Sequence, residues 1–586
     1  MKPDNAVDFE LRGRPFRAAS ISIVAMTLVL SACLGDGTSN TATSTSAGSG
    51  RPVTAAEASR FLAQASMGAS DEEIAAVQAR GYTGWIDDQI KQPQTLAQPY
   101  VEAMAAKQGV GYFGNFLPTS VVYNAFWART ATGGDQLRQR VAWALSQIFV
   151  ISLQVATLSQ LPRGVANYLD MLGKDAFGNY RTLLQDVTLH PAMGIYLSAF
   201  ENINDPAHNA FPNQNYAREV MQLFSIGLIQ LNQDGSPKLQ NGKPVPTYGQ
   251  PDIVGLSHVF TGFGWYASNP DFSTWAGLSS DPNRDVTAMS AYPYHSSAEK
   301  RFLGVDIPAQ STPDAMSDLR IALDTLFNHP NVGPFIGKQL IQQLVTSNPS
   351  PAYVARVSQA FDTGHFSTGR WKIGTGSRGD LSAMVAAVLL DAEARDITKL
   401  NDAQFGRVRE PVLRLSAWMR GFHALSSSGS FSIGDTGNPA HALAMSPMDS
   451  PSVFNFYPSD FTPAGSPLGT AGLVAPALKI TNASSVVGYA DYIRQVVASE
   501  GTPGTDPDVF SSYAKEMSLA SNPTALVNWL NLLLAYGTLS AHTQSLIEDA
   551  VNTIAIPSGD PTIALRQRIS VAVTLALCAP EFIVQK

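Results

Sequence analysis

The sequence predicts a mainly α-helical protein, with a large multi-helix body, long irregular loops and at most a small β-hairpin. Apolar residues recur every three or four positions in many successive segments, which is the spacing of an amphipathic helix. Helix-capping signatures precede several of these segments, whereas the alternating pattern of a strand is rare. With 586 residues, 45% of them hydrophobic and 15% charged, the chain has the composition of a globular protein with a sizeable core.

Predicted helices follow one another along most of the chain. Thr54 to Glu57 and Ser70 to Glu73 match capping boxes before amphipathic runs, and Asp135 is placed to cap a third helix. Further helical spacing occurs at residues 168–197, 319–344 with a break near His329 and Pro330, 381–395, 412–425, 525–536 and 565–578. Residues 238–248 carry Asn-Gly at their centre and predict the hairpin.

Two long segments, residues 266–295 and 426–472, are irregular and rich in Gly, Pro and Ser. Loops of this length in a helical domain usually serve a function. They either lie over a cleft or are insertions at the surface. The second loop contains VFNFYPSDF (residues 453–461), whose rings either stack on sugar rings or attach the loop to the core.

The first 32 residues predict a lipoprotein signal peptide. A basic start is followed by AASISIVAMTLVLSAC, an apolar run too short to span a bilayer. It ends in Leu-Ser-Ala-Cys, the pattern in which bacterial lipoproteins acylate the cysteine, here Cys33. A plain secretory signal is the alternative. Residues 33–51 would form the lipidated cysteine and a flexible Ser/Thr/Gly tether, and residues 52–586 the helical domain.

The net charge and the residues around the cysteines indicate where the protein is located and which partners it can have. The net charge of −8 argues against a nucleic-acid partner. Leu34, a non-acidic residue after the cysteine, favours anchoring by lipid in the outer membrane of the cell envelope. Once Cys33 is acylated, Cys578 has no disulfide partner, and its apolar helix predicts a buried, inert thiol.

Several motifs identify a family. FLAQASMGASDEEIAAVQARGYTGWIDDQI, PNQNYAREVMQLFSIGL, LSHVFTGFGW and the terminal APEFIVQK, in this order, resemble the bacterial family called domain of unknown function 1800 over roughly residues 52–586. The resemblance implies an exported, mainly helical protein and no particular reaction. Such proteins are often encoded beside an exported family resembling sulfatases, so we expect a co-exported sulfatase-like partner.

This chain departs from the family pattern at four positions. The signature close to P-N-E-N-x-A-R-E reads PNQNYARE at residues 212–219, so Gln214 replaces a Glu. Gln147, Gln222 and Ser296 stand where related members carry histidine or acidic residues. These neutral side chains favour a binding role over acid–base or metal chemistry.

Residues 200–219 form the densest polar stretch and the main candidate site. In one interpretation Asn213 or Asn215 caps a helix, and Arg218 and Glu219 are buried and tied to residues 200–215. In another, Arg218 clamps an anion and Glu219 acts as a base. A weaker alternative is a calcium site at Glu201 and Asp205. The candidate ligand-binding residues are Asn213, Asn215, Arg218, Glu219 and His258.

His258 and His295 flank a Gly-aromatic turn, TGFGW, which would let a substrate approach the backbone. A structural role is the commoner one for such histidines, so Glu219 and His295 are only weak catalytic candidates. The sequence contains no HExxH or CxxC motif, no nucleophile elbow and no phosphate-binding glycine loop. No metal or cofactor is therefore expected.

Two functional hypotheses follow. The first is a membrane-anchored lipoprotein with a binding or assembly role at the cell envelope. The second is a surface hydrolase, or another enzyme, that acts on an envelope or extracellular polymer such as a glycan. The neutral side chains favour the first hypothesis, and Arg218, Glu219 and His295 keep the second open.

Overall fold

A computed structural model describes residues 53–111, 117–278, 281–499 and 508–586, which belong to one compact unit spanning residues 44–586. The fold is 53% helical with only short two-stranded sheets, so the predicted mainly α class is confirmed. The predicted signal peptide and the predicted tether with Cys33 lie outside the described residues. Within those residues, no helix is both long and apolar enough to cross a membrane.

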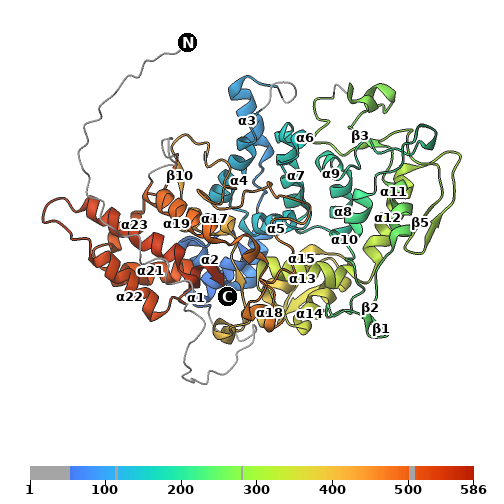
Figure 1. The fold of residues 1–586 in the computed structure, drawn as a ribbon. Coiled ribbons are helices and arrows are strands. Elements are labelled where there is room, and N and C mark those ends of the chain that lie inside the picture. Colours follow the sequence, from blue (N-terminus) through green and yellow to red (C-terminus); the bar gives the residue numbers. More distant parts are fainter. Residues whose placement is uncertain (1–52, 112–116, 279–280, 500–507) are drawn as a thin grey trace, which may run out of the picture. The chain divides into compact units, whose positions relative to one another are not determined.

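The helices of the N-terminal half are α1 Ala55–Ala65, α2 Asp71–Lys91, α3 Gln98–Gln108, α4 Ser120–Thr132, α5 Gln136–Ser146, α6 Ala156–Ser159, α7 Pro162–Asp175, α8 Tyr180–Leu189, α9 Pro191–Tyr196, η1 Pro206–His208, α10 Asn215–Gln222, α11 Gln250–Val259 and η2 Thr274–Leu278. Those of the C-terminal half are α12 Ala315–Asn328, α13 Val332–Leu344, α14 Pro351–Thr363, α15 Leu381–Leu390, α16 Ala392–Arg395, η3 Ile397–Asn401, α17 Pro411–Gly421, α18 Pro467–Thr470, η4 Pro476–Ile480, α19 Ala483–Ala498, α20 Ala514–Leu519, α21 Pro523–Ala535, α22 Ala541–Asn552, α23 Thr562–Cys578 and α24 Pro580–Ile583. Helices α21, α22 and α23 pack against one another (Figure 1).

Local capping signals account for several helix starts. Thr54 and Glu57 form the predicted capping box of α1, and the Ser70 side chain accepts the Glu73 N–H at the start of α2. Asp135 precedes α5 but makes no side-chain cap. Its carboxylate instead accepts the Thr95 N–H at 3.0 Å, because the neighbouring loop competes for the same oxygens.

The strands form six antiparallel pairs, each of two or three residues per strand. They are β1 Leu239–Gln240 with β2 Lys243–Pro244, β3 Phe263–Gly264 with β4 Ser290–Ala291, β5 Lys300–Phe302 with β6 Val305–Ile307, β7 Phe366–Thr368 with β8 Trp371–Ile373, β9 Arg407–Val408 with β12 Val584–Gln585, and β10 Leu425–Ser426 with β11 Val509–Phe510. The first pair is the predicted hairpin, whose Asn241 and Gly242 have φ of 52° and 73°, as a type I′ turn requires. The other five pairs were not predicted, because strands this short carry no readable alternation.

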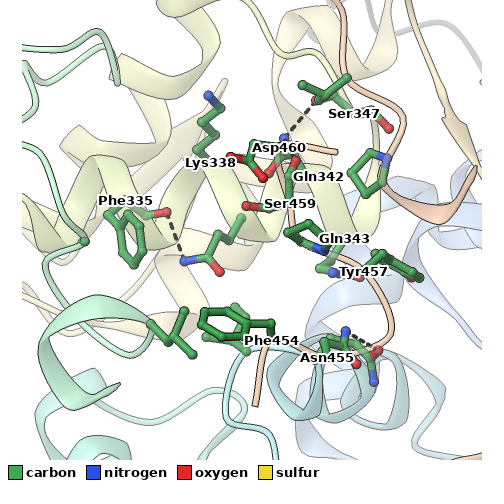
Figure 2. A pocket seen from close by; sticks show the side chains of 18 of the residues that line it. Phe335, Lys338, Gln342, Gln343, Ser347, Phe454, Asn455, Tyr457, Ser459 and Asp460 are labelled. Carbon is green, nitrogen blue, oxygen red and sulfur yellow. Dashed lines mark hydrogen bonds between the residues drawn. The ribbon is translucent and has the colours of Figure 1, made fainter. Parts of the chain in front are cut away.

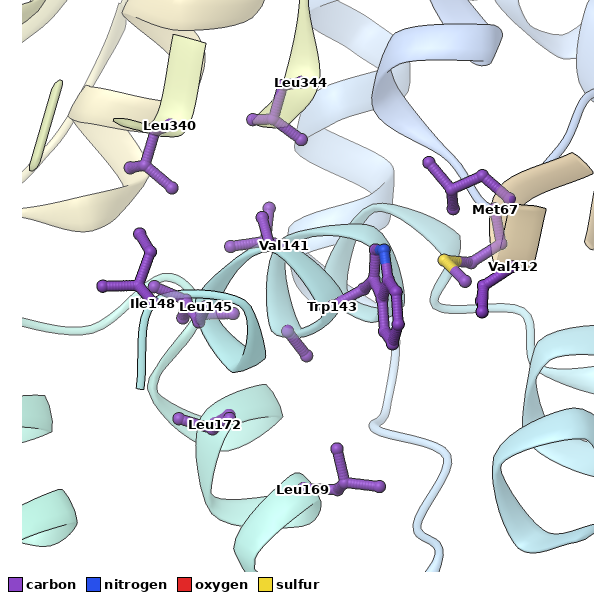
Figure 3. Close-up of a cluster of buried hydrophobic side chains, with 14 of the residues drawn as sticks. Met67, Val141, Trp143, Leu145, Ile148, Leu169, Leu172, Leu340, Leu344 and Val412 are labelled. Carbon is purple, nitrogen blue, oxygen red and sulfur yellow. The ribbon is translucent and has the colours of Figure 1, made fainter. Parts of the chain in front are cut away.

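The hydrophobic core surrounds α5. Figure 3 shows Val141, Trp143 and Leu145 of α5 between Leu340 and Leu344 of α13 and residues of α7. Trp143 is completely buried. Helix α5 is therefore covered on nearly every side, although it also carries the buried Arg140.

A buried charge network lies beside this core. Glu410, just before α17, accepts a hydrogen bond from Trp143 Nε1 at 2.9 Å and pairs with Arg407. Arg140 and Arg407 both donate to the main-chain carbonyl of Gln343 near the end of α13. Burial alone would raise the pKa of Glu410, but Arg407 and Arg140 outweigh it and hold the pKa below its usual value.

Cys578 is the last residue of α23 and is half-buried, whereas the sequence predicted a buried thiol. Burial raises its pKa to about 11. The thiol is therefore protonated at neutral pH and a poor nucleophile.

We predict that Glu410→Gln destabilises the protein by about 3–5 kcal/mol at pH 7, because it leaves two buried guanidinium groups without a counter-charge. Since the folded-state pKa of Glu410 is lowered, its contribution is present above the ordinary carboxyl pKa and is lost as the pH falls through the folded value. The difference from the parent, measured by denaturant unfolding, should therefore shrink in acid. Glu72→Gln, at a side chain that is 71% exposed, is the control. Equal losses for both variants would contradict the network.

Candidate functional site

The predicted polar stretch at residues 200–219 caps α10 through Asn213. The Asn213 side chain accepts the Asn215 N–H at 2.9 Å. The Asn213 N–H in turn donates to the Asn202 side chain at 2.8 Å. Asn213 and Asn215 themselves are exposed. The capping interpretation is thus supported at Asn213, and Asn215 is the first residue of the helix.

Arg218 and Glu219 differ from the expectation. Glu219 is buried, with 7% of its surface exposed, but Arg218 is only half-buried. Within the described parts of the chain, neither side chain hydrogen bonds to residues 200–215, and Oε2 of Glu219 is buried without a partner. The predicted tie to that loop is therefore wrong. The loop satisfies its own polar groups instead, as in the contact of 2.6 Å between His208 and Asp205.

The charge of Glu219 acts on two tyrosines. Burial raises the pKa of Tyr248 and of Tyr196 to about 12, and the charge of Glu219 adds to both shifts. Burial also raises the pKa of Glu219 itself, and the nearby Arg218 offsets only part of that rise. The hydroxyl of Tyr248 is likewise buried without a partner. Glu219 is thus a desolvated carboxyl group beside two phenols.

The calcium alternative finds no support in the geometry. Asp205 is paired with His208, and Glu201 and Asp205 belong to no convergent set of ligand atoms among the described residues. Three side chains whose ligand atoms do converge, Asp71, Glu72 and His423, lie at the surface elsewhere. Lys515 already pairs with Asp71 at 2.9 Å, so one carboxylate of this second group has a counter-charge without an ion.

His295 has a structural role. It is buried, and its Nδ1 lies 2.8 Å from the carbonyl of Thr261 while Nε2 lies 3.0 Å from Asp318. Lys300 also pairs with Asp318, at 2.9 Å. Both ring nitrogens therefore lie within hydrogen-bond distance of groups of the protein itself. No nitrogen of His295 is left for a substrate.

His258 lies nearby but contacts a different group. Its Nδ1 is 2.9 Å from the hydroxyl of Ser296, which also accepts from Asn204 at 2.9 Å. Burial, with help from Lys300 and His295, lowers the pKa of His258, so its imidazole is neutral. The sequence-predicted residues therefore form two small clusters, one at the start of α10 and one around Ser296.

A cavity large enough for a ligand lies away from these two clusters. It is formed by α13, by the end of α10 with its following turn, and by the loop at residues 453–460. We call it the α13 cleft. Its volume is about 510 Å³, which is within the usual range for ligand sites. Figure 2 shows side chains from α13 and from the loop around the open space. The site residues predicted from the sequence do not line it; they are Asn213, Asn215, Arg218, Glu219, His258 and His295.

One face of α13 forms a wall of the cleft. Its lining residues recur at helical spacing and are Phe335, Lys338, Gln339, Gln342 and Gln343. The opposite face carries Ile336, Leu340 and Leu344, which are completely buried in the core. Because burial of that apolar stripe fixes the rotation of the helix, the polar face must point into the cleft.

The loop at residues 453–460 forms the opposite wall and is held by specific contacts. Asn455 donates to the side chain of Gln147 at 2.8 Å. Gln342 donates to the carbonyl of Ser459 at 3.2 Å. Phe454, directly before the first of these contacts, remains 50% exposed. Of the two earlier interpretations of the long loops, the one that places a loop over a cleft holds for residues 453–460.

The glutamine amides of the cleft have unused hydrogen-bonding capacity. In the part of the chain that the structure describes, the side chains of Gln222 and Gln343 make no hydrogen bond, and those of Gln339 and Gln342 bond only through Nε2. Oε1 of Gln343 is also buried. A buried acceptor without a donor is unfavourable, so a ligand hydroxyl or amide would find several partners here.

The buried part of the cleft lining carries one charged side chain, Arg407, and that side chain is paired. Arg407 is paired with Glu410, and burial raises the pKa of Tyr457 far above neutrality, so its phenol is uncharged. Lys338 and Asp460 are exposed, and they carry opposite charges. The cleft therefore suits an uncharged polar ligand.

Sequence reasoning located part of this site. Gln147 and Gln222, two of the neutral replacements, line the cleft, and so does the aromatic loop. The other two replacements do not line it, since Gln214 accepts from Gln250 and Ser296 contacts His258. The polar face of α13 was missed. In the sequence, the only signal for this polar face is a group of glutamines on an otherwise apolar helix. Glutamines in that pattern are equally expected on a helix face that contacts solvent.

The comparisons place the chain in a family. The family model described as Protein of unknown function (DUF1800) matches residues 60–584. No curated protein matches the chain. No solved structure matches it either.

We predict that Glu219→Gln raises the melting temperature by a few degrees at pH 8 and leaves it unchanged at pH 4. Since burial raises the folded-state pKa of Glu219, the folded protein is favoured while the carboxyl is protonated. That advantage is lost as the pH rises through the folded pKa. Scanning calorimetry at both pH values tests this. A lower melting temperature at pH 8 would mean that Glu219 has a partner that requires its charge.

Proposed function

The chain belongs to the DUF1800 family of proteins of unknown function, and we propose that it is an exported lipoprotein that binds a polar ligand in the α13 cleft without transforming it. The observation that carries the proposal is the set of unused glutamine amides around a cavity of about 510 Å³. Concave sites with a few convergent polar groups are the usual places for ligands.

The chemistry of the cleft supports binding rather than catalysis. A hydrolase needs a positioned acid, base or nucleophile. The charged lining residues are Lys338 and Asp460, which are exposed, and Arg407, which is paired with Glu410. These groups make no acid–base pair. The hydrolase alternative then depends on Glu219, whose buried and unpartnered carboxyl lies outside the cleft lining.

The N-terminal sequence supports attachment to a membrane. Leu-Ser-Ala-Cys at residues 30–33 is followed by 17 residues, Leu34–Gly50, most of them small or polar. An acylated Cys33 would hold the helical domain near the outer membrane, within reach of envelope polymers. In this proposal, a co-exported sulfatase-like partner supplies the chemistry that the α13 cleft does not.

We predict that Cys33→Ala abolishes acylation and releases the protein from the membrane fraction, because the thiol is the site of lipid attachment. Metabolic labelling with a radioactive fatty acid, followed by fractionation, measures both effects. Cys578→Ala, at the other cysteine, is the matched control and should retain label and membrane association. Labelling that persists in Cys33→Ala would contradict the anchor.

We predict that Gln339→Arg reduces binding to insoluble cell-envelope material at least tenfold, because it introduces bulk and an unpaired charge into a neutral cleft. Co-sedimentation of the mature lipoprotein with envelope material measures the binding. Gln359→Arg, on an exposed position of α14, adds the same charge outside the cleft and should bind like the parent. Equal binding by the two variants would contradict a role for the cleft.

A further inference from the structure

We propose that the α13 cleft binds a neutral glycan chain, with sugar rings against Phe454 and Phe335 and sugar hydroxyls on the glutamines of α13. This inference rests on the proposed function, because it names the class of ligand that the cleft holds. It is carried by three features of the cleft: one exposed and one half-buried aromatic ring, unused amides, and lining charges that are either paired or of opposite sign at the exposed rim.

The first feature is a pair of rings on different walls. Phe454 leaves half of its surface exposed although it lies in a loop that is otherwise held firmly. Phe335 approaches the cavity from α13 (Figure 2). Its ring lies against the backbone of Gly227, where an added Cβ would come within 2.7 Å of the ring. Rigid aromatic faces of this kind pack well against the C–H faces of sugar rings.

The second feature is the match between amides and hydroxyls. A glutamine side chain offers both donors and acceptors, and so does each sugar hydroxyl. Gln222, Gln339 and Gln343 reach the cleft from two elements and retain free donors or acceptors. A chain of hydroxyl-bearing rings can satisfy several of these groups together, including the buried Oε1 of Gln343.

The walls fit an extended peptide less well. Peptides bind commonly by adding a strand to an exposed sheet edge or by laying an apolar helix face into an apolar groove. Helix α13 presents side chains and no free main-chain edge to the cleft, because its amides and carbonyls are used within the helix. Its lining positions Gln339, Gln342 and Gln343 are polar.

The third feature is the neutral interior. An acidic polymer, such as a uronate or phosphate chain, would need cations that are free to pair with it. Arg407 is already paired with Glu410. Lys338 is the one other cation of the lining, and Asp460, which also lines the cleft, carries the opposite charge. The net charge of −8 also opposes a polyanion. A neutral glycan needs no free cation in the cleft and is not repelled by the negative net charge of the protein.

The test is isothermal titration calorimetry of the full mature lipoprotein in a detergent without a sugar headgroup, because alkyl glycosides would compete for the cleft. The probes are neutral pentasaccharides of glucose with β1,4, β1,3 or α1,4 linkages, a pentamer of N-acetylglucosamine, a pentamer of galacturonate and an uncharged soluble peptide. We expect at least one neutral saccharide to bind and the galacturonate and peptide to bind at least tenfold more weakly.

Two pairs of variants locate the binding. Phe454→Ala should weaken the neutral saccharide at least tenfold, whereas Phe211→Ala, at another exposed phenylalanine outside the cleft, should not. Gln339→Ala should weaken it several-fold, whereas Gln359→Ala on α14 should not. Phe454 and Gln339 lie at the surface of the cleft, so thermal melting should show that all four variants remain folded.

The outcomes separate this inference from the proposed function. Preferred binding of galacturonate or of the peptide at the cleft would overturn the neutral-glycan inference and leave a binding cleft in place. If no saccharide binds but Gln339→Arg still abolishes association with envelope material, the neutral-glycan inference is also overturned and the binding cleft remains. If the envelope association is also insensitive to Gln339→Arg, both proposals fail. Saccharide binding that Phe454→Ala leaves unchanged would likewise overturn the inference.

Discussion

The geometry of the cleft depends on how Arg140 and Arg407 hold the main-chain carbonyl of Gln343. Arg407 Nη1 donates to that oxygen at 2.7 Å, and Arg140 donates to it from α5. Carbonyls at the end of a helix carry partial negative charge, so cations are favourable there. Buried guanidinium groups are tolerated only with a counter-charge, and Glu410 supplies it. One carboxylate thus secures the end of α13.

This arrangement prepares the site before any ligand arrives. Core packing of Ile336 and Leu340 sets the rotation of α13, and the arginines hold its C-terminal turn. The facing loop is held independently, through Asn455 to Gln147 and through Ser459 to Gln342. Because both walls are fixed in the free protein, little conformational entropy is lost on binding. Within the described residues, two glutamines that face the cavity, Gln222 and Gln343, have side chains without a hydrogen-bond partner.

The sequence predicted those features that depend on local signals. The helical class, the capping box at Thr54, the hairpin at Asn241 and Gly242, and the break between α12 and α13 at His329 and Pro330 all follow from short-range rules. The predicted contacts of Arg218 and Glu219 with residues 200–215 were wrong. They assumed that polar residues close in sequence bond to one another. In the structure their neighbouring loop bonds within itself, and Glu219 is buried without a hydrogen bond to that loop.

The cleft itself could be predicted only in part. Gln147, Gln222 and the aromatic loop were recognised as unusual, but nothing in the sequence showed that segments so far apart meet one another. The polar stripe of α13 has the same pattern as a face in contact with solvent. Its role depends on the loop at residues 453–460 crossing in front of it, and that crossing is set by contacts between residues more than 100 positions apart.

The most direct measurement is a crystal structure of the mature chain grown with the neutral pentasaccharide that binds most tightly. We expect sugar rings in contact with Phe335 and Phe454, with hydroxyls at hydrogen-bond distance from Gln339 and from Oε1 of Gln343. The positions of α13 and of residues 453–460 should match those of the free protein. A saccharide bound elsewhere on the surface, with the α13 cleft empty, would contradict the account.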